Sequence, residues 1–406
     1  MVIYILVMLH LKKISMSKII NVLILLCPLQ AFSQSTFEKI FGGVELPEYG
    51  HCAIQTNDEG NILIGEDGSE DIYIVKTDKN GIKIWDKHYG GRNSDHGYDV
   101  KQTSDNGFIV VGSTDDFGKN ESTNVYILKL NSIGDTLWTK AYGTDFGDYG
   151  YSIIESLDKG FILTGMTYDF STGMQNLLIL KTDKYGNQVW MKVYKCKNSY
   201  VGKSIIPTND GNYIILTDKP ELGGQIINSH LRLFKINQSG DTLWTKVIKK
   251  GYSFQAGNII QTKDNGYLLS GTSIGDSSNK DYATDIYLVS LNSKGETIWM
   301  KNYGNKDSDF GRHVIQTKDL NYVVVGDSYR HENNNTFTDL VIFKVKRDGS
   351  IIWSKTNKSV GYKIPGSVCE TKDLGLLIGG TLNNNNRSYD DMFLLKIDKF
   401  GNLNNK

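Results

Sequence analysis

The sequence predicts an all-β protein, a seven-bladed β-propeller whose blades are four-stranded antiparallel sheets. The first observation behind this prediction is a repeat with a long period. Six tryptophans occupy one place in the repeat, separated by 53, 52, 54, 55 and 54 residues: Trp85, Trp138, Trp190, Trp244, Trp299 and Trp353. A period of this length is typical of propellers and solenoids.

The second observation is a short turn that occurs seven times. It reads Thr-x-Asp, with Ser in place of Thr in one copy, and it begins at Thr56, Thr103, Ser156, Thr208, Thr262, Thr317 and Thr371. An Asp at this place in a turn accepts backbone N–H groups of the turn itself. The chain therefore contains seven repeat units, numbered here in chain order.

Each unit divides into four strand segments, and the second unit, at 97–143, is representative. After a first segment at 97–102, the segments at 108–111 and 125–130 are continuously apolar, so both of their faces must be covered. The fourth segment alternates as Trp138, Lys140 and Tyr142, and every unit has the Lys, which is typical of a protected edge strand. Four-stranded sheets packed face to face around an axis meet both requirements.

The third observation concerns the two ends of the repeat. The last unit has a turn at Gly401 but no Trp segment after it, whereas Phe37 and Lys39 match Trp85 and Lys87 in position. We expect residues 36–42 to complete the last blade and so close the ring. An open solenoid would need polar caps at its ends, and the sequence offers none.

Composition indicates one domain over residues 34–406. The 406 residues include 42 Gly and only 5 Pro, without a linker-like stretch, and 45 Lys and Arg balance 45 Asp and Glu without blocks of one sign. This pattern predicts no nucleic-acid partner and no anionic membrane surface. We expect a monomer.

Residues 1–33 are predicted to be a signal peptide, with Met16 as the true start. Lys18 precedes the apolar run 19–26, and Ala31 and Ser33 suit cleavage before Gln34. Neither apolar run near the N-terminus reaches the roughly 20 residues of a membrane span. The mature chain is therefore expected to be secreted or periplasmic, without membrane insertion.

The cysteines and histidines indicate neither a disulfide framework nor a metal site. Cys52, Cys196 and Cys369 are odd in number and unrelated in spacing, so buried free thiols are expected, although a bridge between Cys52 and Cys369 stays open. The dispersed histidines lack metal-ligand spacing, which predicts no metal centre. Whether the loops bind a calcium ion is also left open.

The repeats resemble those of secreted bacterial β-propellers. The resemblance rests on GFIVVGST and NVYILKLNSIGDTLWTKAYG in one unit, and on GYLLSGTS and DIYLVSLNSKGETIWMKNYG in another. It implies the propeller fold over the whole mature chain but no activity, because the family is mostly uncharacterised. The segment from Asp78 to Trp85 is also similar to the tryptophan-docking motif of quinoprotein propellers. No adjacent cysteine pair accompanies it, so we expect no quinone and no other cofactor.

The candidate binding surface is the face on which the repeats differ. The second residue of the first segment varies from unit to unit: His51, Tyr98, Tyr151, Lys203, Gly257, Arg312 and Gly366. Four units begin with an acid, an aromatic residue and Gly, and their acids are Glu48, Asp95, Asp148 and Asp309. From these sets we select eight candidate binding residues: His51, Tyr98, Tyr151, Lys203, Arg312, Asp95, Asp148 and Asp309.

These features predict a secreted, non-catalytic binding or interaction module for a protein or a glycan. One alternative is a carbohydrate-active enzyme, a hydrolase or lyase, with carboxylates at the central mouth of the ring. A second alternative is a structural surface component. Two carboxylates converging in a cleft would favour the enzyme, whereas a wide and shallow rim would favour binding.

Overall fold

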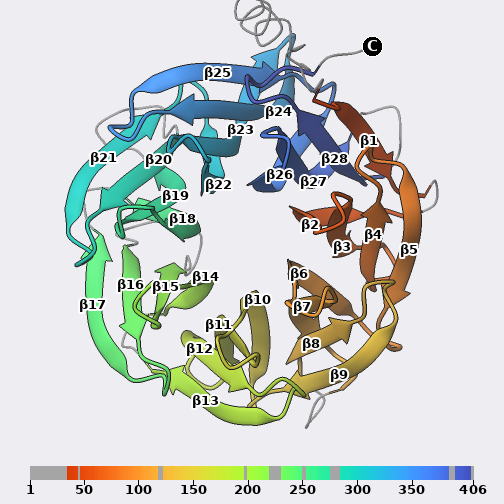
Figure 1. Ribbon diagram of the computed structural model, residues 1–406, viewed down its shortest axis with the longest axis vertical. Coiled ribbons are helices and arrows are strands. Elements are labelled where there is room, and N and C mark those ends of the chain that lie inside the picture. The colour runs from red at the N-terminus through yellow and green to blue at the C-terminus, as the bar shows by residue number, and fades with distance from the viewer. Residues whose placement is uncertain are drawn as a thin grey trace, which may run out of the picture. The chain divides into compact units, whose positions relative to one another are not determined.

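The computed structural model describes residues 34–43, 46–117, 122–195, 199–218, 230–248, 253–274, 284–383 and 389–403. Contacts divide the chain into two compact parts, Met1–Gln34 and Ser35–Lys406. The predicted signal peptide and Cys196 lie outside the described residues, as do parts of several connections between second and third strands. The part Ser35–Lys406 is an all-β propeller of four-stranded antiparallel blades (Figure 1).

Five sheets have four strands each, in chain order. They are β2–β5 (Tyr49–Gln55, Asn61–Glu66, Ile72–Thr77, Lys83–Tyr89), β6–β9 (Asp95–Gln102, Phe108–Thr114, Asn124–Leu130, Thr136–Tyr142) and β10–β13 (Gly147–Glu155, Phe161–Asp169, Met174–Thr182, Gln188–Tyr194). The other two are β14–β17 (Val201–Pro207, Tyr213–Asp218, Leu231–Ile236, Thr242–Ile248) and β18–β21 (Ser253–Gln261, Tyr267–Ile274, Thr284–Leu291, Thr297–Tyr303).

The remaining strands form one eight-stranded sheet within the described residues. It contains β22–β25 (Asp309–Gln316, Tyr322–Glu332, Asn335–Val345, Ile351–Asn357), β26–β28 (Tyr362–Glu370, Leu376–Asn383, Asp391–Ile397) and β1 (Phe37–Phe41). One parallel pair, Thr338 with Tyr362, joins β24 to β26. The prediction of separate four-stranded sheets therefore differs from the structure at this place. Strand β1 pairs antiparallel with β28, from Phe37 opposite Lys396 to Phe41 opposite Met392.

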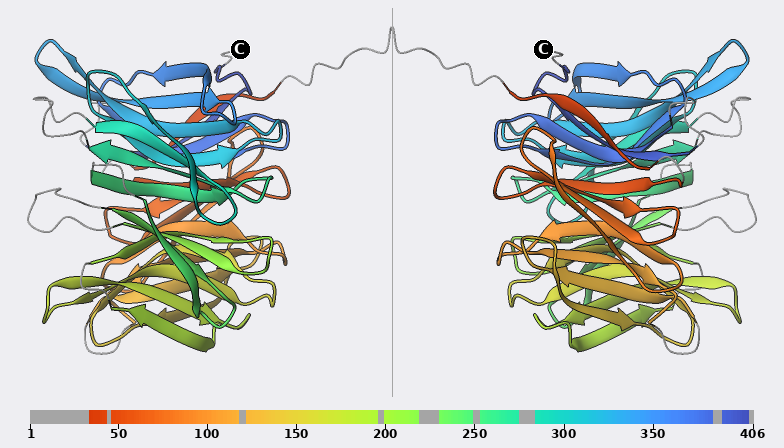
Figure 2. Two further views of the ribbon diagram at one scale, coloured as in Figure 1. Left: turned by 90° about the vertical axis from the view of Figure 1, so that its left-hand side faces the viewer. Right: turned by 90° about the vertical axis from the view of Figure 1, so that its right-hand side faces the viewer.

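The sheets are arranged around a central axis, with the first strand of each unit innermost and the fourth outermost (Figures 1 and 2). Second and third strands such as β7 and β8 are buried throughout, whereas fourth strands such as β9 are mostly exposed. The apolar core consists of layers between neighbouring sheets. One layer, for example, joins Ile109 and Val111 of β7 to Ile153 of β10 and Leu163 of β11.

Each Trp packs on the Gly turn of the next unit, which explains the constant spacing of both. A Cβ added to Gly134 would lie only 2.9 Å from Trp85, and Gly134 has a φ of +82° that favours glycine. The hydroxyl of Tyr89 donates a hydrogen bond to the Gly134 carbonyl at 2.6 Å. At the N-terminal strand, Phe37 takes the Trp place and packs on Gly81.

The repeated Thr-x-Asp turn has the structural role that the sequence predicts. In the second unit, the Asp105 carboxylate accepts hydrogen bonds from the Gly107 N–H at 2.9 Å and from the Lys129 ammonium. Burial raises the pKa of Asp105, but hydrogen bonds from Thr103, Lys129 and Gly107 outweigh it and lower the pKa to about 2. The carboxylate is therefore ionised and fixed in its own turn.

Within the described chain, Cys52 and Cys369 are free thiols. No helix of this part is long and apolar enough to cross a membrane.

Candidate functional site

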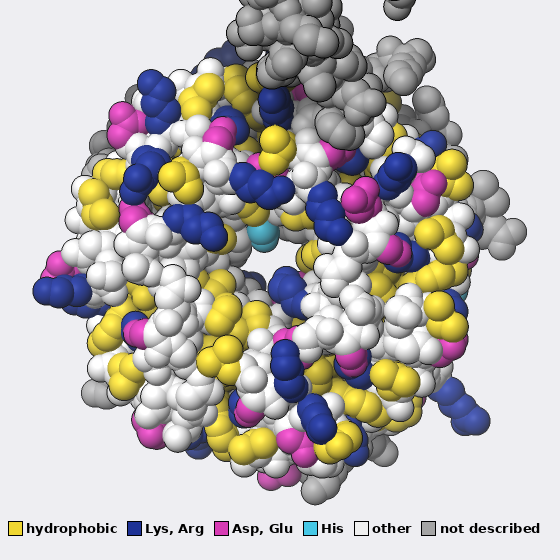
Figure 3. Space-filling view, in the orientation of Figure 1, with side chains coloured by type: hydrophobic (Ala, Val, Ile, Leu, Met, Phe, Trp, Pro, Cys, Tyr) yellow, Lys and Arg dark blue, Asp and Glu magenta, His cyan; other side chains and the backbone are white. Residues whose placement is uncertain are grey.

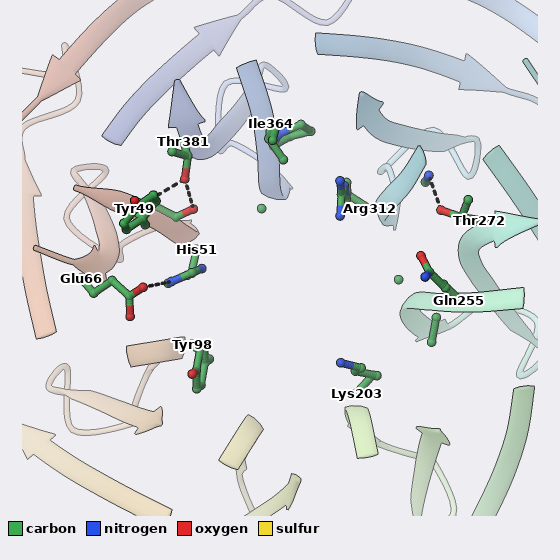
Figure 4. A pocket seen from close by; sticks show the side chains of 16 residues that line it. Tyr49, His51, Glu66, Tyr98, Lys203, Gln255, Thr272, Arg312, Ile364 and Thr381 are labelled. Carbon is green, nitrogen blue, oxygen red and sulfur yellow. Dashed lines mark hydrogen bonds and ion pairs between the residues drawn. The ribbon is translucent and has the colours of Figure 1, made fainter. Parts of the chain in front are cut away.

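A pocket of about 570 Å³ opens on the axis, at the end of the propeller where the first strands begin. Side chains from different first strands point into the shared space (Figure 4). Six of the seven second-position residues line it: His51, Tyr98, Lys203, Gly257, Arg312 and Gly366. The ring that the sequence marks by its variability is thus brought together in one cavity. Viewed down the axis, the molecular surface is open at the centre, with basic side chains and a histidine around the opening (Figure 3).

A β-bulge at the same place in every first strand accounts for this convergence. The pairing register skips His51 in β2, Tyr98 in β6, Lys203 in β14 and Arg312 in β22, and it is irregular at the equivalent place in the other three first strands. A bulged residue has no partner on the neighbouring strand, and the bend turns its side chain away from the regular alternation. The variable residues are therefore those that the sheets leave free to face the axis.

One side of the pocket is aromatic. The ring of His51 meets the edge of Tyr98 at a centroid distance of 5.5 Å, and Tyr98 contacts Tyr151 at 5.2 Å. Tyr151 does not line the pocket, but it extends this aromatic row to Lys203, whose Nζ lies 4.9 Å from the Tyr151 ring centroid. Burial raises the pKa of Tyr98 to about 12, so its phenol keeps its proton near neutral pH.

An acid flanked by two histidines lies beside this row. Glu66 of β3 lies 3.8 Å from His51 Nε2 and makes an ion pair with His96 Nδ1. Burial raises the pKa of Glu66, but the two imidazoles outweigh burial and lower the pKa to about 2. The hydrogen bond to Glu66 in turn raises the pKa of His96. Glu66 is therefore a permanent anion near neutral pH and a poor proton donor.

The opposite side carries two cations in different settings. The Arg312 guanidinium binds Asp327 through Nε at 2.5 Å and a terminal nitrogen at 3.3 Å, and Asp327 is only 1% exposed. Burial raises the pKa of Asp327, and the charge of Arg312 counteracts this effect. By contrast, no carboxylate of the described residues lies within ion-pair distance of Lys203. Lys203 therefore contributes an uncompensated positive charge to the pocket.

The predicted acids lie outside the pocket. Asp95, Asp148 and Asp309 are almost fully buried, and each accepts a backbone N–H from the loop that precedes it: Gly91 at 2.7 Å, Thr144 at 2.6 Å and Asn305 at 2.8 Å respectively. Burial raises the pKa of all three carboxyls. Glu48 accepts the Gly43 N–H in the same manner at 2.7 Å. In this structure these acids hold the loops together instead of facing a ligand.

The third residues of the first strands, just below the pocket, join neighbouring units. Ser367 Oγ accepts the Ala53 N–H at 2.7 Å, Asp99 accepts the Ile153 N–H at 3.1 Å, and Asn258 accepts the Val314 N–H at 2.7 Å. Their small or polar character therefore reflects contacts between units.

Below this ring the channel contains a charged pair. Lys101 Nζ lies 2.6 Å from Asp99, and burial together with the Lys101 charge lowers the pKa of His313 to about 3. The imidazole of His313 is therefore neutral near pH 7.

Several residues of the site were not found from the sequence. Glu66 and Asp327 occupy the same repeat position in the second strand, where the fourth unit has Asp218 and the other four units have Ser, Met or Thr. The change from an uncharged residue to an acid at this position was the available signal. Within the described chain, no group of three or more His, Cys, Asp or Glu side chains is arranged to hold a metal ion. Glu66 is the one acid among the described pocket residues, so the pair of carboxylates required by most glycosidases does not converge there.

No protein-family model matches the chain, and no curated protein is similar to it in sequence. Solved structures are similar in fold. An ulvan lyase, a polysaccharide lyase bound to -[GlcA(1-4)Rha3S]-, is 12% identical with a TM-score of 0.61, and the alignment covers 91% of this chain and 98% of the lyase. The β-propeller domain of the Trilobed protease from Pyrococcus furiosus, described as having an open velcro topology, is 9% identical with a TM-score of 0.51, covering 89% and 98%. At such identities the similarity concerns the fold alone.

Proposed function

We propose that the protein is a secreted or periplasmic, non-catalytic binding module that holds an anionic glycan in the axial pocket. The observation that carries the proposal is the division of the pocket into a cationic side, with Lys203 and Arg312, and an aromatic side, with His51 and Tyr98. Aromatic rings present apolar faces to the C–H surface of a sugar, while a guanidinium and an ammonium bind carboxylate or sulfate groups.

The charge balance of the pocket supports an anionic ligand over a neutral one. Arg312 is neutralised by Asp327 and His51 lies against Glu66, but Lys203 has no acidic partner among the described residues. Placing a carboxylate or sulfate beside Lys203 would supply the missing counter-charge. The ulvan lyase of the same fold is itself bound to an acidic saccharide, which is in keeping with this proposal.

The test is a glycan array with neutral, carboxylated and sulfated members, followed by calorimetry on the mature protein. We expect anionic glycans to bind, with an affinity that falls as salt is added. Lys203→Ala should weaken binding about tenfold, as the loss of one charge-assisted hydrogen bond does. Lys184→Ala is the matched control, because Lys184 also lies 4.9 Å from a tyrosine ring centroid but on a turn outside the pocket. Equal binding by both variants would refute the assignment, and binding of acidic peptides alone would point to a protein ligand.

The second candidate is a carbohydrate-active enzyme, and one observation favours it: the His51–Glu66–His96 group next to the Tyr98 phenol. A histidine oriented by a carboxylate is a common general base. Incubation of bound glycans with the protein, followed by measurement of new reducing ends, separates the two functions. A turnover that His51→Ala and Tyr98→Phe abolish would establish the enzyme.

We further propose that the fold is a closed ring of seven blades, with β22–β25 and β26–β28 plus β1 as two blades linked by a single residue pair. Two contacts between the last and first units support closure: Ser367 with Ala53, and the Lys372 N–H with Gln55 at 2.7 Å. The packing of Phe37 on Gly81 supports it as well. A crosslink between Cys residues placed at positions 53 and 367 would form readily in such a ring.

A further inference from the structure

The face opposite the pocket is held together by a hydrogen bond that recurs between successive units. The middle residue of the Thr-x-Asp turn donates its backbone N–H to the last side chain of the neighbouring first strand. The donors and acceptors are Asn57 and Gln102, Ser104 and Glu155, Asn209 and Gln261, Lys263 and Gln316, Lys318 and Glu370, and Lys372 and Gln55, at 2.7–3.0 Å.

This bond is missing between the third and fourth units. The donor there is the Leu157 N–H, but the neighbouring position is Pro207, which has no acceptor side chain. Among the described residues, the Leu157 N–H donates no hydrogen bond. Leu157 is also the one apolar residue at its turn position, and at 81% exposure it is the most exposed of the large hydrophobic side chains in the described chain.

A small cavity opens where the bond is missing. Its volume is about 250 Å³, and Leu157, Pro207 and the ring of Tyr213 supply its apolar walls. The Tyr213 hydroxyl is held by Gln238 at 2.9 Å, and Gln238 in turn donates to the Gly211 carbonyl, so the floor is fixed. This volume is below the roughly 300 Å³ at which small-molecule pockets usually begin. It suits a single apolar side chain.

We propose that this boundary is a docking site for an extended peptide segment of a partner protein, which inserts one apolar side chain between Leu157 and Pro207 and accepts the Leu157 N–H with a backbone carbonyl. The two departures from the repeat, Pro207 and Leu157, match the backbone and the side chain of such a peptide respectively. Replacing Gln or Glu by Pro leaves a donor for the peptide backbone, and replacing a polar turn residue by Leu provides an apolar contact for its side chain. The site is independent of the axial pocket.

The probe is a set of capped heptapeptides, Ser-Gly-Thr-X-Thr-Gly-Ser, with X as Leu, Phe, Trp, Asp or Gly. Binding is followed by NMR through the Leu157 amide of the mature protein. We expect the peptides with Leu, Phe or Trp to shift this amide, and those with Asp or Gly to bind about tenfold more weakly or worse. Failure of every peptide to shift the Leu157 amide would overturn the proposal.

Pro207→Gln restores the acceptor found at the other boundaries and therefore occupies the Leu157 N–H, and it also removes the Pro207 wall of the cavity. It should slow hydrogen exchange of the Leu157 amide and weaken the apolar peptides at least about tenfold, with the melting temperature kept or raised. Leu157→Asn should also weaken binding of the apolar peptides. Leu320→Asn is the matched control and should not weaken it, because Leu320 is an exposed leucine of the sixth unit, in a turn whose Lys318 N–H is hydrogen-bonded to Glu370. Unchanged peptide affinity in Pro207→Gln would refute the site. A concentration-dependent dimer of the wild type that Pro207→Gln abolishes would assign it to a second copy of the chain instead.

Discussion

Replacing Gly134 by Ala tests whether the contact between tryptophan and the Gly turn holds successive units together. The new Cβ would lie 2.9, 3.0 and 3.1 Å from three ring carbons of Trp85, so the indole ring would have to shift. Such overpacking costs about 1–3 kcal/mol. The residue also has a φ of +82°, and a left-handed backbone costs a non-glycine residue about 1–2 kcal/mol more. The expected loss is therefore about 2–5 kcal/mol.

The matched control is Gly211→Ala. Gly211 has a similar φ of +76° but nothing within 4 Å of an added Cβ, so this variant carries the backbone strain alone. Urea denaturation followed by circular dichroism gives the free energy of unfolding of both variants. We expect Gly134→Ala to be about 1–3 kcal/mol less stable than Gly211→Ala. Equal stability of the two variants would show that the contact with Trp85 does not resist compression, and the argument would fail.

Four further predictions follow from the site and the ends of the domain. Deleting residues 34–43 removes β1 and should lower both the melting temperature and the cooperativity of unfolding, and an unchanged transition would contradict the closed ring. Replacing the four pocket-side residues Tyr98, Tyr151, Lys203 and Arg312 by Ala should abolish glycan binding while the protein stays folded by circular dichroism, with some loss of stability because Arg312→Ala leaves the buried Asp327 without its counter-charge. In the wild type, the lowered pKa of Glu66 means that its carboxylate stabilises the fold above pH 4.5 and that this stabilisation is lost as pH falls toward about 2. The pKa of His96 is raised from 6.5, so its imidazolium stabilises the fold below pH 6.5, and this stabilisation is lost as pH rises through the pKa of His96 in the folded protein. The destabilisation by His96→Gln, measured by urea denaturation across pH, should thus be greatest between about pH 4.5 and 6.5. Finally, N-terminal sequencing of the exported protein should begin near Gln34, and a start at Met1 or Met16 would exclude the predicted cleavage.

The repeat predicted most of the fold because the same pattern of apolar segments, turns and Trp recurs along the chain. The Trp spacing, the Thr-x-Asp turns and the apolar pairs of segments correspond to fourth strands, turns and buried middle strands in the structure. The sequence did not predict the pair between Thr338 and Tyr362, because β23 and β24 are longer than their counterparts and one residue of contact leaves no periodic signal.

For the site, variability identified the residues that line the axial pocket, but not the reason why they lie there. The bulges that turn His51, Tyr98, Lys203 and Arg312 toward the axis depend on strand register, which a sequence pattern with period two does not encode. The sequence also did not show that the candidate acids Asp95, Asp148 and Asp309 lie outside this pocket. An Asp next to an aromatic residue looks the same in sequence whether it faces a ligand or, like Asp148, accepts an N–H of its own loop.

The pairing of β1 with β28 also has a consequence for the time course of folding. All other antiparallel pairs among the described strands join neighbours in the sequence, so they can form while the chain is being made. Strand β1 is among the first parts of this domain to be made, yet its partner is among the last. At roughly 5–20 residues per second, β1 waits on the order of 20–70 s for β28. During that interval the apolar side chains of β1, Phe37, Ile40 and Phe41, have no partner strand and are available to other chains, and only the charges of Glu38 and Lys39 oppose such pairing.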